Sequence, residues 1–343
     1  MSVSASQITP LGTNPSDQIT IVMVAHGRAD VVRQTLTSLA NCKQPAAFAG
    51  MILVENGPPC GMAEAIAPFQ DQLRITHETV SSPKKTVALN HALKLIGTGW
   101  ALFIDDDVRV SSDWISLYAH AIAREPKGYY FGGPTACDYE QPPPAWLRLY
   151  LPDSARGLQF PEGTHDVRYP SCFLGFNWAA DIEALLQAGG FPEQFGPGTP
   201  YGGGDESFMQ LRLAELGQRG ILIPEALVWH QISSDRCTPQ WCIKRMYAGG
   251  QTAGLEAAWH DFRHPRRLAA LRSHARHFKN RVASWPLGDL IRLNEHGRFW
   301  IRRLWSSMRG FCHGYRDALQ GRPHPEPFLS QPHHHREHDS THV

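Results

Sequence analysis

The sequence has little of what marks secreted, zinc-binding or membrane-spanning proteins. Its seven cysteines are scattered and form no CxxC pair, so we predict neither a disulfide framework nor a zinc site. No apolar run approaches the roughly 20 residues of a membrane-spanning helix. Residues 1–18 are rich in Ser, Thr and Pro, without the basic and apolar segments of a signal peptide. A cytoplasmic, reducing location is therefore the default prediction.

Two other absences narrow the range of partners. The formal net charge is only +1, which gives no general argument for a nucleic-acid partner. The dinucleotide-binding pattern GxGxxG is missing, and so is the P-loop pattern GxxxxGK followed by Ser or Thr. At 343 residues, 42% of them apolar, the chain is long enough for one large domain or two small ones. We therefore expect an ordinary globular protein without either of these phosphate loops.

Strand-like and helix-like segments alternate in the first half of the chain. Short apolar or β-branched runs predict strands at residues 20–25, 51–54, 73–76 and 100–104. Helical patterns fall between them at residues 29–40 and 85–95. Such alternation is typical of βαβ units. The fold class we predict is α/β, with a mostly parallel central sheet flanked by helices.

Beyond residue 130 the pattern becomes less regular. Residues 146–164 lack a clear period and predict a long surface excursion of the kind that often binds substrates. A Gly-rich segment leads into a predicted helix at residues 206–216. Apolar strands are predicted at residues 220–223 and 226–229, and helices from residue 238 onward.

Three adjacent carboxylates, Asp105, Asp106 and Asp107, follow the fourth predicted strand. The carboxyl ends of such strands are where open α/β sheets bind ligands. Clustered acids repel one another, and their oxygen atoms favour a hard cation such as Mg²⁺ or Mn²⁺. The alternative is an Asp-rich turn that caps a helix starting at Ser111, although one acid is enough for a cap.

Two further features are predicted at the same end of the sheet, the pair Asp205-Glu206 behind three glycines and His230 at a strand end. Together with the three adjacent acids, they resemble the family 2 glycosyltransferases with the GT-A fold. The resemblance covers roughly residues 19–254 and rests on six segments, residues 21–39, 54–57, 85–90, 104–107, 203–212 and 228–230. Each motif alone is weak, and their common order carries the resemblance.

The resemblance implies a nucleotide-diphosphate sugar bound by the first half of the chain. The implied donor-binding residues are Ala25, His26, Arg28, Glu55, Asn56, Lys85, Asn90, Asp105 and Asp106. Asp107 and His230 are implied ligands of Mn²⁺ or Mg²⁺. Glu55 lies where the family commonly has a shorter acid against the nucleobase, which leaves the choice of nucleotide open. The alternative for Lys84 and Lys85 is a solvated basic turn.

The attacking hydroxyl needs a base on the opposite face of the sugar. The family order is Glu-Asp, whereas this chain has Asp205-Glu206. Alignment on Gly204 and Arg212 makes Glu206 the base, while side-chain identity favours Asp205, and we predict Glu206. The alternative is a helix start in which Asp205 is the N-cap and Glu206 a first-turn acid. The implied acceptor-binding residues are Gly203, Gly204 and Trp178.

The resemblance thus implies an inverting, metal-dependent enzyme that moves one sugar to a saccharide or lipid-linked acceptor, in bacterial surface polysaccharide or glycoconjugate synthesis. A sugar nucleotidyltransferase and a non-catalytic saccharide-binding protein of the same fold are the alternatives. The expected segments are a disordered start at 1–18, a nucleotide-sugar-binding half at 19–130, an acceptor-binding half at 131–237, a helical extension at 238–320 and a disordered tail at 321–343.

Residues 299–319 alternate aromatic and aliphatic residues with Arg302, Arg303 and Arg309. Such an amphipathic helix either packs on its own domain or rests on a membrane surface, and we favour packing. The alternative adds peripheral contact with the inner face of the membrane to the predicted cytoplasmic location.

Overall fold

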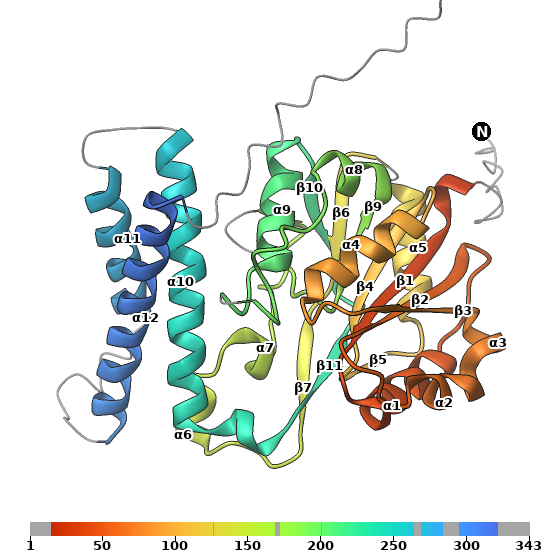
Figure 1. Cartoon of the computed structure of the whole chain (residues 1–343), viewed down its shortest axis with the longest axis horizontal. Coiled ribbons are helices and arrows are strands. Elements are labelled where there is room, and N and C mark those ends of the chain that lie inside the picture. Colours follow the sequence, from red (N-terminus) through yellow and green to blue (C-terminus); the bar gives the residue numbers. More distant parts are fainter. Residues whose placement is uncertain are drawn as a thin grey trace, which may run out of the picture.

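The computed structural model describes residues 15–125, 127–168, 172–199, 201–263, 269–283 and 295–321. Within them, an eight-stranded and a three-stranded sheet form the body of the molecule, and long C-terminal helices stand together at one side (Figure 1). The predicted disorder at residues 1–18 and 321–343 falls mostly outside this description. Where the structure describes that start, Pro15–Asp17 form the short 3-10 helix η1.

The first half of the chain forms a parallel part of the large sheet. Its main elements are β1 (Ile19–Ala25), α1 (Ala29–Ala40), β2 (Phe48–Asn56), β3 (Ile75–Val80), α4 (Lys85–Leu95) and β4 (Trp100–Asp105). β1 pairs in parallel with β2 and β4, and β3 continues the sheet beyond β2. Apolar clusters cover both faces, so β1 and β4 are almost completely buried. The predicted α/β class is confirmed, and both predicted helices have the expected bounds.

Three short helices between β2 and β3 were not predicted. They are α2 (Met62–Ile66), η2 (Ala67–Phe69) and α3 (Gln70–Leu73). Because α3 ends at Leu73, the third strand starts at Ile75, two residues later than its apolar pattern indicates.

The second half extends the large sheet with strands of both directions. Its strands are β6 (Tyr129–Gly132), β8 (Asp166–Val167), β9 (Trp178–Asp181) and β10 (Arg219–Leu222). β9 is antiparallel to its neighbours β4 and β6, and the order is β3-β2-β1-β4-β9-β6-β10-β8. The accompanying helices are α5 (Trp114–Arg124), α8 (Ile182–Gln187) and α9 (Asp205–Glu215). The sheet is therefore mixed, with parallel pairs in the majority.

The small sheet brings the late histidine beside the early acids. It consists of β5 (Val108–Val110), β7 (Thr135–Tyr139) and β11 (Val228–Ile232), with β11 in the middle. β11 is antiparallel to β5, and in their register His230 lies opposite Val108. His230 thus lies inside a strand that is longer than predicted. Its partner on β5, Val108, directly follows Asp107, so the histidine lies beside that acid.

The predicted surface excursion at residues 146–164 is partly packed. It contains α6 (Ala145–Arg148) and α7 (Asp153–Arg156). Leu147, Leu151 and Ala155 are buried in an apolar cluster that also includes residues of the C-terminal helices. The prediction of an exposed loop is wrong for this part. Helices of four residues are too short to show a helical period in the sequence, so their buried apolar residues were not recognised.

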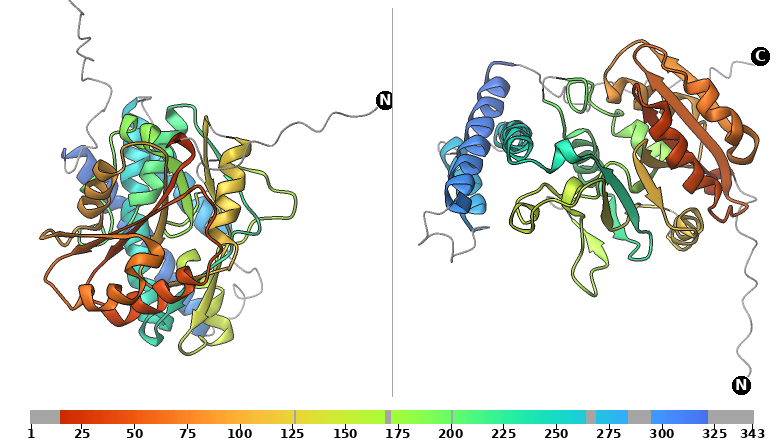
Figure 2. Two further views of the ribbon diagram at one scale, coloured as in Figure 1. Left: turned by 90° about the vertical axis from the view of Figure 1, so that its right-hand side faces the viewer. Right: turned by 90° about the horizontal axis from the view of Figure 1, so that it is seen from below.

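The C-terminal helices are η3 (Ser234–Cys237), α10 (Pro239–Arg263), α11 (Ala269–Ala283) and α12 (Glu295–Leu319). α10 lies between α12 and the sheets (Figures 1 and 2). The backbones of α10 and α12 touch. A Cβ atom on Gly250 would lie 2.2 Å from the Ser307 carbonyl oxygen, and a Cβ atom on Gly314 would lie 2.0 Å from the Gln251 carbonyl oxygen. Most large apolar side chains of α12 are buried, in agreement with the packing we favour for residues 299–319, whereas Trp305 and Leu319 are exposed. No described helix is long and apolar enough to cross a membrane.

Candidate active site

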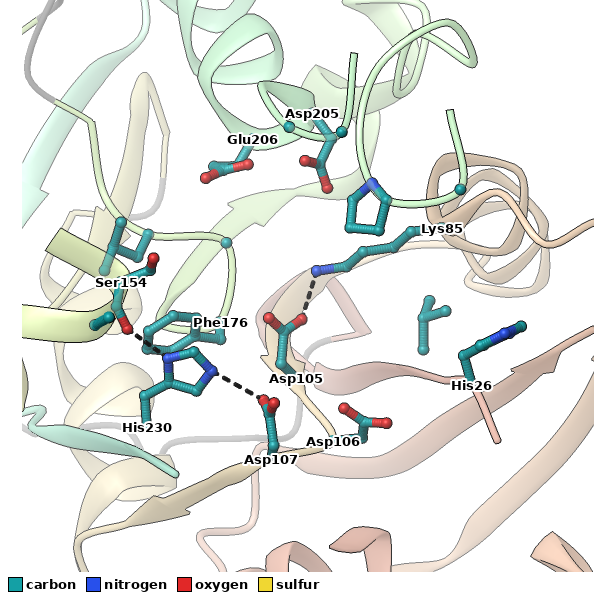
Figure 3. A pocket seen from close by; sticks show the side chains of 18 of the residues that line it. His26, Lys85, Asp105, Asp106, Asp107, Ser154, Phe176, Asp205, Glu206 and His230 are labelled. Carbon is teal, nitrogen blue, oxygen red and sulfur yellow. Dashed lines mark hydrogen bonds and ion pairs between the residues drawn. The ribbon is translucent and has the colours of Figure 1, made fainter. Parts of the chain in front are cut away.

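A cavity of about 470 Å³ lies at the carboxyl ends of β1 and β4. Both halves of the chain line it. Figure 3 shows the acids at the end of β4 together with His230 on one side, and Asp205 and Glu206 across from them. The three features that the sequence placed at one end of the sheet therefore meet in a single cavity.

Lys85 and Asp105 form an ion pair inside this cavity. The Lys85 Nζ atom lies 2.5 Å from Asp105 Oδ1, and the lysine side chain is 14% exposed. Burial lowers the pKa of Lys85, but Asp105 and Asp205 outweigh it and raise the pKa above its ordinary value. Lys85 is therefore a buried cation, and the alternative of a solvated turn is wrong for it.

Asp106 and Asp107 share the guanidinium of Arg28, the N-cap residue of α1. Arg28 contacts Asp106 and lies 3.0 Å from Asp107 Oδ2. Arg236 reaches the same Asp107 oxygen at 3.3 Å. Burial and the Asp107 charge raise the pKa of Asp106 to about 6, whereas cationic partners hold that of Asp107 below its ordinary value despite burial. These acids do not cap α5, whose N-cap is Asp113.

His230 has the arrangement of a histidine prepared to bind a metal. Its Nδ1 lies 2.5 Å from the Ser154 carbonyl oxygen, which can accept a hydrogen bond from Nδ1–H, and its Nε2 lies 3.1 Å from Asp107 Oδ1. Burial lowers the pKa of His230, but the hydrogen bond with Asp107 raises it, and the net shift is upward.

One imidazole nitrogen and one carboxylate oxygen fit Mn²⁺ or Mg²⁺ if the substrate supplies the other ligands. Among the described residues, no group of three or more His, Cys, Asp or Glu side chains could hold a metal ion. Mg²⁺ is commonly bound by one or two protein carboxylates plus phosphates and water. The donor set thus fits a cation that enters with a phosphorylated ligand.

Asp205 and Glu206 begin α9, and neither is its N-cap. The N-cap is Gly204, which has a φ of 92° and makes no side-chain cap, so the helix-cap alternative is wrong for Asp205. Burial, and then the neighbouring Asp205, raise the pKa of Glu206 to about 8, while Lys85 opposes them. A Cβ atom on Gly204 would lie 2.5 Å from Thr252 Cγ2, so both its backbone angle and its neighbour require glycine. Gly203 also lines the cavity.

His26 and Asn56 line the cavity on the side of β1 and β2. The His26 Nδ1 atom lies 2.5 Å from the Asn56 carbonyl oxygen. The Asn56 amide donates to the Pro83 carbonyl oxygen at 2.9 Å, and its own Oδ1 is buried without a partner in the described structure. An unpaired buried acceptor of this kind is uncommon, and it belongs to a residue that lines the cavity.

Three of the implied donor-binding residues, Ala25, Glu55 and Asn90, do not line the cavity, and two of them have polar side chains with other partners. Glu55 is buried, accepts the backbone N–H of Cys60 at 2.9 Å and lies 3.4 Å from the His77 ring. Asn90 accepts from and donates to the backbone of Phe191, so its amide fixes a loop. Neither lines the cavity, and their predicted contacts with the nucleotide are corrected accordingly.

Trp178 and Ala25 belong to the core. Trp178 is 1% exposed, and its ring stacks on Phe103 with centroids 4.7 Å apart. Ala25 is fully buried at the end of β1. The prediction of Trp178 as an acceptor residue is wrong, because its strand position directs the ring into an aromatic cluster and away from the cavity.

Several residues around the cavity were missed. Arg236 follows the small sheet and reaches Asp107, and Phe176 packs on the His230 ring with centroids 4.7 Å apart. Trp241 and Arg245, near the start of α10, also line the cavity. The sequence indicated Arg236 only as a cation six residues after His230. Such a spacing is common by chance, so it could not identify Arg236 as a site residue.

Comparison with known proteins gives one matching family model and several solved structures of similar fold. Residues 20–181 match the sequence model described as Glycosyl transferase family 2. The mannosyltransferase PcManGT from Pyrobaculum calidifontis, solved with GDP-Man and Mn²⁺, is 18% identical with a TM-score of 0.54, over 92% of this chain and 90% of that one. No curated protein matches.

Two other solved structures are similar at lower identity. TarS 1-349 from S. aureus is 11% identical with a TM-score of 0.50, over 89% of this chain and 92% of that one. GalNAc-T7 with UDP, GalNAc and Mn²⁺ is 13% identical with a TM-score of 0.51, over 89% of this chain and 58% of that one. These likenesses confirm the predicted GT-A type of fold.

Proposed function

From the premise that the chain belongs to glycosyl transferase family 2 and transfers a sugar from a nucleotide sugar, we propose that it is an inverting, metal-dependent enzyme that adds a single sugar to a saccharide or lipid-linked acceptor. One observation carries the proposal. A single cavity has a charge-paired group of acids on one wall, and on the other the acidic pair Asp205-Glu206, in which the pKa of Glu206 is raised. Sugar transfer needs such a division, since a diphosphate leaves one face of the sugar while a hydroxyl attacks the other.

The first wall binds the donor. Arg28 and Arg236 present guanidinium groups beside Asp107, and Lys85 adds an ammonium group. Asp107 and His230 would hold Mn²⁺ or Mg²⁺, which supplies positive charge against the leaving diphosphate. The Mn²⁺ in the PcManGT and GalNAc-T7 complexes supports this choice of cation. Asn56 and His26 offer hydrogen bonds to the nucleoside.

The second wall supplies the base. As the acceptor oxygen bonds to the anomeric carbon and the bond to the diphosphate oxygen breaks, the hydroxyl proton passes to the Glu206 carboxylate. The raised pKa makes the Glu206 carboxylate a stronger base than an ordinary glutamate, and general-base catalysis is most efficient when the pKa lies near the working pH. Asp205, buried beside it, accepts hydrogen bonds from the acceptor.

A second cavity of about 460 Å³ meets Glu206 and provides a path for the acceptor. Its lining includes Gln159, Phe160, Ser207 and Glu256. Hydroxyl, amide and carboxylate groups beside an aromatic ring are suited to a sugar. The acceptor therefore presents a saccharide to Glu206, and the setting we propose is bacterial surface polysaccharide or glycoconjugate synthesis at the cytoplasmic side.

Nucleotide-sugar turnover with and without Mn²⁺ tests this function. Release of a nucleoside diphosphate supports transfer, exchange of pyrophosphate supports a nucleotidyltransferase, and no turnover of any nucleotide sugar supports a non-catalytic binding protein. A thermal-shift screen of nucleoside diphosphates first identifies the nucleotide. A ligand at ~100 times its dissociation constant stabilises a protein by about 2.7 kcal/mol, which is easily detected.

A further inference from the structure

The outward side of α12 carries a continuous line of exposed side chains. Their spacing alternates between four and three residues, which keeps them on one side of a helix. We call them the outer stripe, and they are Arg298, Arg302, Trp305, Arg309, Cys312, Arg316 and Leu319. Trp305 is 65% exposed and Leu319 59%, whereas the opposite side of α12 packs on α10. Large apolar side chains this exposed are few in the described chain, and two of them lie here.

The outer stripe is strongly basic in a chain of almost no net charge. Four of its seven residues are arginines, and none of the four forms an ion pair within the described part of the chain. The acidic Asp317 of α12 is only partly exposed and accepts a hydrogen bond from the Tyr201 hydroxyl. The whole chain has a formal net charge of +1, so positive charge is concentrated on this helix.

α11 packs beside α12 and continues the same chemistry. Its sequence contains no acidic residue. Arg272, Arg276 and Lys279 are exposed, and so is Phe278 at 48%. Both helices therefore present cations next to apolar side chains.

We propose that the outer stripe binds the surface of an anionic lipid bilayer. Lipid phosphates attract the arginines. The boundary between headgroups and acyl chains is a more favourable environment than water for the exposed Trp305 indole and the Leu319 side chain. A nucleic acid would match the arginines but would leave Leu319 and Phe278 without an apolar partner. The membrane contact is thus made by the basic side of α12, because its more apolar side is already buried in the protein.

The contact would bring a lipid surface close to the catalytic cavity, which goes beyond the proposed function. The backbones of α10 and α12 touch, since a Cβ atom on Gly310 would lie 2.1 Å from the Tyr247 carbonyl oxygen. α10 also supplies Trp241 and Arg245 to the cavity. One helix, α10, therefore lies between the lipid-binding side and the site and contacts both.

Co-sedimentation of the full chain with vesicles tests the proposal. We expect binding to vesicles of equal parts phosphatidylcholine and phosphatidylglycerol, loss of binding at high salt, and little binding to phosphatidylcholine alone. The double variant Arg302→Gln/Arg309→Gln should bind roughly 25-fold more weakly, about fivefold for each arginine. A matched control, Arg33→Gln/Arg124→Gln, removes two exposed arginines from α1 and α5 and should bind as the unchanged protein does.

Three results would overturn the proposal. They are equal binding to neutral and anionic vesicles, equal losses in the stripe and control variants, and binding to single-stranded RNA but not to vesicles. Trp305→Ser adds a test of the apolar part, because it should weaken binding without changing its dependence on salt. Each variant should keep its melting temperature and its release of nucleoside diphosphate in solution, so a failure here is distinguishable from a failure of the proposed function.

Discussion

The two walls of the cavity hold their carboxylates in opposite ways. On the donor wall, Asp105 and Asp107 each contact a cation, and the pKa of Asp107 is lowered. On the acceptor wall, Asp205 and Glu206 adjoin each other, and the pKa of Glu206 is raised. An acid that binds a cation must stay ionised, whereas a general base must be able to take up a proton. Asp106 on the donor wall is an exception, since burial and the Asp107 charge raise its pKa to about 6. The difference in charge compensation therefore separates Asp107 from Glu206.

The largest expected effect concerns the base. Glu206→Gln should lower turnover by ~10²- to 10⁴-fold, because general-base catalysis typically contributes that much. Asp205→Asn should lose far less, and nucleotide affinity should change little in either variant, since both residues lie on the acceptor wall. Steady-state rates of nucleoside diphosphate release, with nucleotide affinities from titration, measure both effects.

The contrary results are equally informative. If Asp205→Asn is the inactive variant, side-chain identity was the better guide and the alignment through Gly204 is one residue off. If neither variant loses more than a few-fold, the base lies elsewhere and the two walls do not differ in the way we propose.

The next effect concerns the donor wall. Asp107→Ala should abolish the dependence of nucleotide binding on Mn²⁺, because the cation loses its charged oxygen ligand. His230→Ala should weaken binding of a nucleoside diphosphate more than that of the nucleoside. Calorimetric titrations with and without Mn²⁺ measure both. Unchanged Mn²⁺-dependent binding in Asp107→Ala would remove the metal from this wall, and equal losses for both ligands would place His230 outside the diphosphate site.

The sequence predicted the regular first half far better than the second. Buried runs such as residues 100–104 and the helical periods of α1 and α4 follow from local patterns, and their bounds agree closely with the structure. β6 and β7 are short and follow glycine and proline breaks, so their patterns did not distinguish them from loops. Whether such short segments form strands depends on their pairing with segments that are distant in the sequence.

The same contrast holds for the site. Residues that directly follow a predicted strand, such as Asp105 and His26, could be placed at the cavity. The orientation of Glu55 could not, because it depends on Cys60 and His77, which pack against it from other segments. Arg236 was missed because only the folded chain brings it to Asp107.

A smaller effect should appear in the pH dependence of turnover. If Glu206 is the base, turnover should rise with pH toward about 8 and then level off, since only the ionised form accepts the proton. Removing the neighbouring charge in Asp205→Asn should lower the pKa of Glu206 and move this rise to lower pH by roughly one unit. Rate profiles of both proteins check this, and coincident profiles would show that Asp205 does not act on the base.

The smallest effect is on thermal stability, and it has opposite signs for the two walls. The pKa of Glu206 is raised from its ordinary value of 4.5 to about 8, so the folded state holds this proton more tightly than the unfolded state does. Its contribution to stability is complete below pH 4.5 and is lost as the pH rises toward 8. Glu206→Gln should therefore gain a few degrees in melting temperature at pH 8 compared with the unchanged protein, and little at pH 4.5.

Asp107→Asn is the matched control for that difference. The pKa of Asp107 is lowered below its ordinary value of 3.8, so its ionisation stabilises the fold above that pH and this contribution is lost only in stronger acid. The variant should therefore melt lower than the unchanged protein by a similar amount at every pH between 5 and 8, where Asp107 is ionised in both states. Melting curves recorded across this range distinguish the two walls directly. A rise with pH in the relative melting temperature of Glu206→Gln, beside a constant deficit for Asp107→Asn, is expected. Parallel curves for the two variants would mean that both walls are compensated alike, and the assignment of Glu206 as the proton acceptor would lose its electrostatic basis.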